Sequence, residues 1–309
     1  MKDAINFTNA YYIKLGVGGK WADSSINEDK ARIGYAGWRL EQINTRSWEF
    51  LKTQYRHGYK NDASATTDLN ALENFVVSNP EDIWVTFHSG KLWWCRLANG
   101  PLQEDDISKY RDTSGAWKNQ DVNGRELLIN QIPGSISKIQ GFRGTVCKIH
   151  EVEVLKRLIN GIQSDAYQHI FNANSNLISQ VENGLKLLHW KDFEALVDLV
   201  FREAGWQRIS VLGETMKFTD MDLREPITNE LYQVQVKSAA SLSDFQQYAD
   251  NFSHGSYRKL YFVVHSPEPN LVAYQATECR NDIELIFPNK LAALVVDMGL
   301  TKWLLDKIR

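Results

Sequence analysis

The spacing of apolar residues changes near the middle of the chain, and this change separates two regions of different predicted structure. In the first half, aromatic and β-branched residues gather in short runs: residues 11–15 predict a strand, and residues 82–97 predict a hairpin. From Glu151 onward, apolar residues recur every three or four positions, which is the spacing of one helix face. We therefore predict a β-rich region at 1–150, followed by a helical connector at 151–186.

Residues 187–309 predict a third segment, in which helices and strands alternate. Between residues 192 and 204 five apolar side chains fall on one helical face, and Gly205 then supplies a helix-ending signal. The elements predicted after this helix are strands at 206–212, 218–223, 231–236 and 259–265, and helices at 243–251 and 291–308. This order predicts a mixed sheet flanked by helices.

Polar side chains gather on two of these predicted strands. Side chains alternate between the two faces of a strand, so Gln233, Gln235 and Lys237 share one face. Asp220 and Asp222 likewise share a face of the preceding strand. Pairing of the two strands would bring a carboxylate, an amide oxygen and an ammonium group to one place.

Such a set suits the hydrolysis of a phosphodiester bond, which needs a hard cation to neutralise the phosphate and activate water. We expect Asp222 and Gln235 to bind Mg²⁺, together with the carbonyl of Val236. Lys237 would orient or deprotonate the attacking water and stabilise the developing charge.

The same residues resemble a known family. Asp192-Phe193-Glu194 opens the predicted helix, Gly205-Trp206 follows it, and Asp222 and Gln235-Val236-Lys237 come next. Over residues 187–308 this order resembles the Mrr-type branch of the PD-(D/E)XK nucleases. The resemblance implies metal-dependent DNA cleavage with the catalytic residues Glu194, Asp222, Gln235 and Lys237.

Two alternatives stay open at this site. Glycines usually precede the aspartate in that branch, whereas Phe218-Thr219-Asp220-Met221 precedes it here, which leaves Asp220 as a rival metal ligand. A polar strand face is often simply solvated, and a glutamate such as Glu194 is favoured in a first helical turn by the helix dipole alone.

Tryptophan is concentrated in the first 150 residues, which contain seven of the ten in the chain. The order of strand, glycine loop, tryptophan and aromatic hairpin resembles the PUA-like superfamily, which includes EVE and YTH domains. The resemblance implies a small β-barrel, and several members of the superfamily hold a modified base in an aromatic cage. The candidate base-binding residues are Trp21, Tyr35, Trp38, Trp84, Trp93 and Trp94. The alternative for each ring is a place in the core.

Composition adds three limits. The net charge of -3 means that attraction to nucleic acid must come from local features. Three widely spaced cysteines support neither a disulfide framework nor a zinc site. No apolar stretch approaches the length of a membrane span and no leader pattern begins the chain, so we expect a cytoplasmic protein.

Together these patterns predict a two-domain protein of the α+β or α/β class, with a recognition domain at 1–150 and a nuclease domain at 187–309. The predicted function is that of a modification-dependent restriction endonuclease that hydrolyses double-stranded DNA near a modified base, which we expect to be a cytosine derivative. Cutting two antiparallel strands requires two active sites or the repositioning of one, and we expect a homodimer. An ordinary sequence-specific endonuclease and a non-catalytic nucleic-acid-binding module remain the alternatives.

Overall fold

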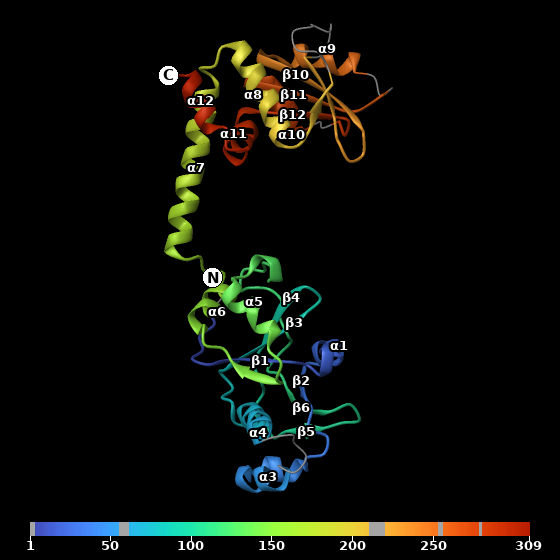
Figure 1. Ribbon diagram of the computed structural model, residues 1–309, viewed down its shortest axis with the longest axis vertical. Helices are drawn as coiled ribbons and strands as arrows, with labels where there is room; N and C mark the ends of the chain where they lie inside the picture. Colours follow the sequence, from blue (N-terminus) through green and yellow to red (C-terminus); the bar gives the residue numbers. More distant parts are fainter. Residues whose placement is uncertain (1–3, 56–61, 210–219, 253–255, 278–279) are drawn as a thin grey trace. The chain divides into compact units, whose positions relative to one another are not determined.

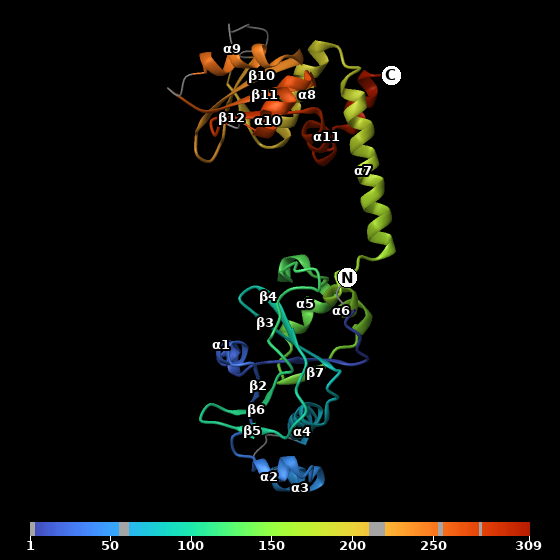
Figure 2. The same cartoon turned by 180° about the vertical axis from the view of Figure 1, so that it is seen from behind.

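The computed structural model describes residues 4–55, 62–209, 220–252, 256–277 and 280–309, and Figures 1 and 2 show its elements from two sides. The chain divides into unit 1, Met1–Asp165, and unit 2, Ala166–Arg309. Each buried cluster of apolar side chains lies within one unit. None of the described helices is long and apolar enough to cross a membrane.

Unit 1 contains two open sheets in its described residues. The first has the strand order β4-β3-β1-β7, in which β1 pairs in parallel with β3 and antiparallel with β7. The second has the order β2-β6-β5 and is antiparallel. The strands are β1 (Ala10–Ile13), β2 (Lys30–Ile33), β3 (Ile83–His88), β4 (Lys91–Cys95), β5 (Gln103–Glu104), β6 (Lys109–Asp112) and β7 (Val146–Lys148).

The prediction of a β-barrel for residues 1–150 was wrong, because the described strands form no closed barrel. Helices take up most of the described chain between β2 and β3, where further strands would have been needed. In the longest of them, Leu69, Leu72 and Phe75 are buried at helical spacing. The helices of unit 1 are α1 (Ala22–Asn27), α2 (Leu40–Asn44), α3 (Trp48–Tyr55), α4 (Asp62–Val77), α5 (Gly134–Ser137) and α6 (Val152–Ile159).

The predicted hairpin at 82–97 is confirmed as β3 and β4, which pair antiparallel. Ser89 and Gly90 link the strands with φ values of 49° and 74°. Positive φ at both central positions is the conformation of a type I′ turn, whose twist matches that of the flanking strands. The hairpin fixes the faces on which its three tryptophans lie.

Unit 2 is built on one mixed five-stranded sheet of order β12-β11-β10-β9-β8. Strands β10, β11 and β12 are parallel, whereas β9 is antiparallel to both β10 and β8. The strands are β8 (Gln207–Arg208), β9 (Met221–Arg224), β10 (Leu231–Ala240), β11 (Tyr257–Pro267) and β12 (Ile283–Ile286). The mixed sheet predicted for this region is present.

Helices cover both faces of this sheet. Val234, Val236 and Val263 pack into a core with α7, α8, α11 and α12, whereas Phe262 and Val264 pack with α9 and α10. The helices are α7 (Asp165–Leu185), α8 (Trp190–Glu203), α9 (Leu242–Asn251), α10 (Pro269–Thr277), α11 (Pro288–Asp297) and α12 (Thr301–Lys307). The region of the predicted connector therefore contains α6, packed in the core of unit 1, and α7, whose C-terminal end packs in unit 2.

Candidate active site

The register between β9 and β10 places the polar residues of the two strands. Asp222 lies opposite Gln233 and Met221 opposite Val234. The backbone N–H of Asp220 donates to the carbonyl of Val234 at 3.0 Å, which carries the pairing one residue further. Asp220 is therefore beside Gln235, whereas Asp222 lies two residues further along the strand.

Asp220 contacts Gln235 directly. Its Oδ2 accepts hydrogen bonds from the backbone N–H of Val236 at 2.7 Å and from Nε2 of Gln235 at 2.5 Å. Burial nevertheless raises the pKa of Asp220, because desolvation outweighs these hydrogen bonds and the nearby charges of Lys237 and Arg208. The carboxylate is held in place at a cost in solvation.

Glu194 lies on α8, next to Phe193, which is part of the buried stripe of that helix. Burial raises the pKa of Glu194, and repulsion by the Asp220 carboxylate raises it further. The charges of Arg208 and Lys237 act in the opposite direction. The electrostatic partner of Glu194 among the strand carboxylates is thus Asp220.

Lys237 completes this group. Burial disfavours its charged form, but a hydrogen bond with Tyr248 and the carboxylates of Asp220 and Asp244 outweigh burial and raise the pKa of Lys237. Its Nζ lies 5.1 Å from the centre of the Tyr248 ring. Lys237 is therefore a cation at neutral pH, a state that suits charge stabilisation and the orientation of water better than proton abstraction.

Asp222 has different surroundings, although it shares a strand face with Asp220. The side chain is buried and hydrogen-bonded to Tyr257. Burial raises the pKa of Asp222, and the Tyr257 hydrogen bond and the charge of Arg208 offset this only in part. The structure thus brings Glu194, Gln235 and Lys237 together around Asp220 and places Asp222 next to them.

Arg208 is a member of the site that the sequence analysis missed. Its Nη1 lies 3.3 Å from Oδ1 of the buried Asp198, and its Nη2 donates to the backbone carbonyl of Asp220 at 3.1 Å. Asp198 is one helical turn after Glu194 on α8. Arg208 therefore connects the helix that carries Glu194 to the strand segment that carries Asp220. Its positive charge offsets part of the rise in the pKa of Glu194 and of Asp220.

The donor chemistry of the site suits magnesium. Two carboxylates that repel each other, Glu194 and Asp220, stand beside the amide of Gln235, and a hard cation would offset both the repulsion and the desolvation. Among the described residues no group of three or more His, Cys, Asp or Glu side chains is arranged to hold a metal. Amide, backbone and water oxygens would thus have to complete the shell, which magnesium commonly accepts.

The six aromatic candidates of unit 1 fall into two classes by burial. Trp38, Trp84 and Trp94 are buried, whereas Trp21, Tyr35 and Trp93 are partly exposed. Trp84 is fully buried and its ring stacks on Tyr11 at a centroid distance of 4.8 Å. A base cannot reach Trp84 without disrupting the core. Trp84 is therefore assigned to the core of unit 1 and not to base binding.

Contacts link the partly exposed rings to neighbouring elements. Trp21 immediately precedes α1, and a Cβ on Gly16 would lie 2.8 Å from its ring, so the glycine there permits close packing. Nε2 of His88, at the end of β3, lies 2.9 Å from Oδ1 of Asp23 in α1. Trp93 donates from its indole N–H to the carbonyl of His88 at 3.2 Å. These contacts tie the hairpin that carries Trp93 to the helix that follows Trp21.

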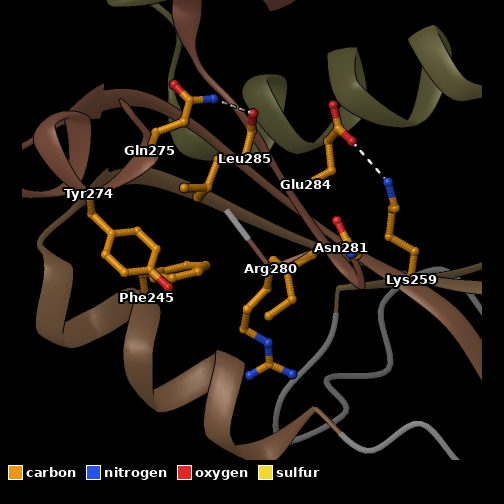
Figure 3. Close-up of a pocket in the computed structure, with 9 residues that line it drawn as sticks. Phe245, Lys259, Tyr274, Gln275, Arg280, Asn281, Glu284 and Leu285 are labelled. Atoms are coloured by element: carbon orange, nitrogen blue, oxygen red, sulfur yellow. Dashed lines mark hydrogen bonds and ion pairs between the residues drawn. The ribbon is translucent and has the colours of Figure 1, made fainter. Parts of the chain in front are cut away.

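A separate cavity of about 230 Å³ lies between α9, α10, β11 and β12, and Figure 3 shows its lining. Arg280 in this lining pairs with Asp282 at 2.5 Å, and Lys259 pairs with Glu284 at 3.0 Å. Both cations are thus already neutralised, and none of the candidate active-site residues lines the cavity.

Comparison with known proteins found no matching family model and no matching curated protein. Among solved structures, the chain is similar to the DNA modification-dependent restriction endonuclease AspBHI, with a TM-score of 0.31 and 13% identity over 73% of this chain and 68% of that chain. It is also similar to the MspJI restriction endonuclease in complex with a 27-mer oligonucleotide, with a TM-score of 0.26 and 12% identity over 92% of this chain and 75% of that chain. Both similarities are distant, and neither assigns a function to this chain.

Proposed function

We propose that the chain is a magnesium-dependent endonuclease that hydrolyses DNA backbones with the site built around Asp220. The observation that carries this proposal is the grouping of Asp220, Gln235 and Lys237 on paired strands, with Glu194 electrostatically coupled to them. Carboxylate, amide and ammonium groups in one place serve a reaction at a polyanionic phosphate.

Asp220 and Gln235 are the proposed metal ligands, and Glu194 contributes a second carboxylate. Asp222, the ligand expected from the sequence, is assigned to a supporting position because it bonds Tyr257. When bound, magnesium would supply Lewis-acid polarisation of the scissile phosphate and a more acidic water. The amide of Gln235 would place an oxygen there without a third negative charge, which limits repulsion between ligands.

Lys237 is proposed to act as a fixed positive charge. Its ammonium group would donate a hydrogen bond to the attacking water or to a non-bridging phosphate oxygen, and it would stabilise the charge that develops there. Because its pKa is raised, it enters the reaction protonated. Arg208 would hold the Asp220 segment in position through the backbone carbonyl.

Unit 1 is proposed to select the DNA by binding an extruded modified base, for which a cytosine derivative remains our expectation. The partly exposed rings of Trp21, Tyr35 and Trp93 support this, because aromatic rings that reach the surface can stack on a flipped base. Cleavage of both strands of a duplex would then use two copies of the chain or the repositioning of one active site.

Digestion of matched duplexes tests the proposal. One duplex carries modified cytosines, the other has the same sequence without them, and each is incubated with magnesium or with EDTA. Cleavage of the modified duplex alone, and only with magnesium, is the expected result. Equal cleavage of both duplexes would favour an ordinary sequence-specific endonuclease, and binding without cleavage of either would favour a non-catalytic module.

A further inference from the structure

The link between α7 and α8 and the first turn of α8 carry exposed apolar and aromatic side chains in unit 2. Leu187 is 70% exposed, and Trp190, the first residue of α8, is 50% exposed. The centre of the His189 ring lies 5.4 Å from that of Trp190, and Nζ of Lys191 lies 5.2 Å from the centre of the Trp190 ring. Unit 2 therefore leaves a tryptophan half uncovered, with a cation over its ring.

The position of this ring on α8 connects it to the candidate active site. A single exposed hydrophobic residue is ordinary by itself. Trp190 and Lys191, however, stand four and three residues before Glu194, and residues at these spacings are neighbours on one side of a helix. The charge of Lys191 also offsets part of the rise in the pKa of Glu194. The exposed ring and its cation therefore lie beside the carboxylate that α8 contributes to the site.

The charge around the start of α8 is positive. Lys186 and Lys191 are exposed, and neither forms an ion pair within the part of the chain that the structure describes. Asp192, the acidic residue beside Lys191, is paired with Lys307 at 2.9 Å. An exposed ring flanked by cations complements a strand of nucleic acid, which offers sugars and bases for packing and phosphates for the cations.

The spacing along the helix matches the spacing of nucleotides along a strand. An α-helix rises about 1.5 Å per residue, so Trp190 lies about 6 Å from Glu194 along the axis of α8. Successive nucleotides in one strand of a duplex are about 3.4 Å apart along its axis. A strand whose scissile phosphate lies at Glu194 would therefore place a nucleotide one or two steps away at Trp190.

We propose that Trp190 and Lys191 bind the DNA strand next to the scissile phosphate, with the ring packed on the sugar and base of one nucleotide and the ammonium group against a neighbouring phosphate. This rests on the proposed nuclease function, because the candidate active site sets where the strand lies. Contacts with sugar and phosphate position a strand and carry no sequence information directly. This surface therefore supplies affinity for any DNA, whereas selection of a modified base belongs to unit 1.

Binding of the full chain to DNA in EDTA tests this contact apart from catalysis. Wild type and variants are titrated with modified and unmodified duplexes of one sequence over a range of salt concentrations. Trp190→Ala should weaken binding to both duplexes equally, by at least about fivefold. Trp190→Phe, which keeps an aromatic ring, should recover most of this loss. Lys191→Ala should weaken binding and reduce the slope of log affinity against log salt concentration by about one.

Two variants elsewhere on unit 2 are the matched controls. Ile227→Ala removes a side chain that is 87% exposed in the turn between β9 and β10, eight residues before Gln235. Lys302→Ala removes an exposed lysine from α12. Both should bind the two duplexes like the wild type, because neither side chain lies on the face of α8 that carries Glu194.

Three results would overturn the proposal. One is wild-type affinity in folded Trp190→Ala and Lys191→Ala. Another is a loss of affinity in Trp190→Ala for the modified duplex alone, since the ring would then read the base. The third is a melting temperature of Trp190→Ala well below that of the wild type, which would mean that the ring packs on protein.

Failure of the proposed nuclease function gives a different result. A wild type that binds DNA but does not nick it in magnesium would refute the nuclease assignment. Weaker binding by the Trp190 and Lys191 variants would still place DNA at the start of α8. A wild type that nicks DNA, together with variants that bind like it, would refute the contact and leave the nuclease assignment intact.

Discussion

Replacement of Trp84 and of Trp21 by alanine should have opposite consequences for folding and for DNA binding. Trp84 is fully buried, with its ring against Tyr11 and edge-on to Phe75 at 5.2 Å. Removal of a buried tryptophan typically costs about 3 to 5 kcal/mol. A domain of the size of unit 1 loses roughly 2 to 4 °C in melting temperature per kcal/mol, so Trp84→Ala should melt roughly 6 to 20 °C lower.

Trp21 should behave differently because it is partly exposed. Its surface contact with Lys20, whose Nζ lies 4.8 Å from the ring centre, contributes only about 0.5 to 1 kcal/mol to stability. A base stacked on its ring would contribute about 1 to 3 kcal/mol to binding, so Trp21→Ala should weaken binding to the modified duplex by about 5- to 150-fold.

The assay pairs a thermal melt with a binding titration, at one fixed salt concentration because DNA affinity depends strongly on salt. Both duplexes, modified and unmodified, are titrated with each variant. Tyr35→Ala and Trp93→Ala extend the series to the other partly exposed rings. If none of these folded variants loses affinity for the modified duplex, the assignment of base recognition to this surface is refuted.

Further predictions concern the candidate active site. Asp220→Asn should reduce the rate of magnesium-dependent cleavage by at least about a hundredfold, which is roughly 2.7 kcal/mol of activation free energy. Asp222→Asn should reduce this rate less, and the plasmid nicking rates of the two variants measure the difference. Arg208→Met should reduce cleavage and weaken magnesium binding measured by calorimetry, and Arg208→Lys should restore part of both. Because the pKa values of Glu194 and Asp220 are raised, cleavage should begin to fall at a pH above the ordinary carboxyl range as the solution is acidified. The raised pKa of Asp220 stabilises the folded protein at a pH below the ordinary aspartate pKa, and this stabilisation is lost as the pH rises through the raised pKa. At pH 7 the carboxylate is charged and poorly solvated, so in EDTA Asp220→Asn should melt at a higher temperature than the wild type.

The strand alternation predicted from the sequence placed Gln235 and Lys237 on one face, and the register of β10 agrees with this. The choice between Asp220 and Asp222 could not be made from the sequence, because the two residues are two positions apart and so share a face. Only the pairing with β10 shows that Asp220, just before β9, lies beside Gln235. A register shift of two residues would bring Asp222 beside Gln235 in place of Asp220, and every side chain would keep its face of the sheet.

Arg208 and Tyr257 could not be found from the sequence either. Each is a single residue with no motif around it, and each reaches the site only through sheet pairing and helix packing. The helices between β2 and β3 were missed for another reason: aromatic residues there, such as Trp38 and Trp48, favour strands by composition. Tertiary packing overrides that preference, as in α2, where Ile43 is buried, and α3, where Leu51 is buried.

The most direct test of the central claim is the conversion of supercoiled plasmid carrying modified cytosines to nicked and linear forms, with wild type and Lys237→Ala compared side by side. The wild type should cut in magnesium and not in EDTA. Lys237→Ala should bind the same DNA with nearly unchanged affinity and lose cleavage by at least about a hundredfold, because its ammonium group acts on the reacting phosphate and not on the rest of the interface. Cleavage by folded Lys237→Ala at the wild-type rate would contradict the assignment of the active site.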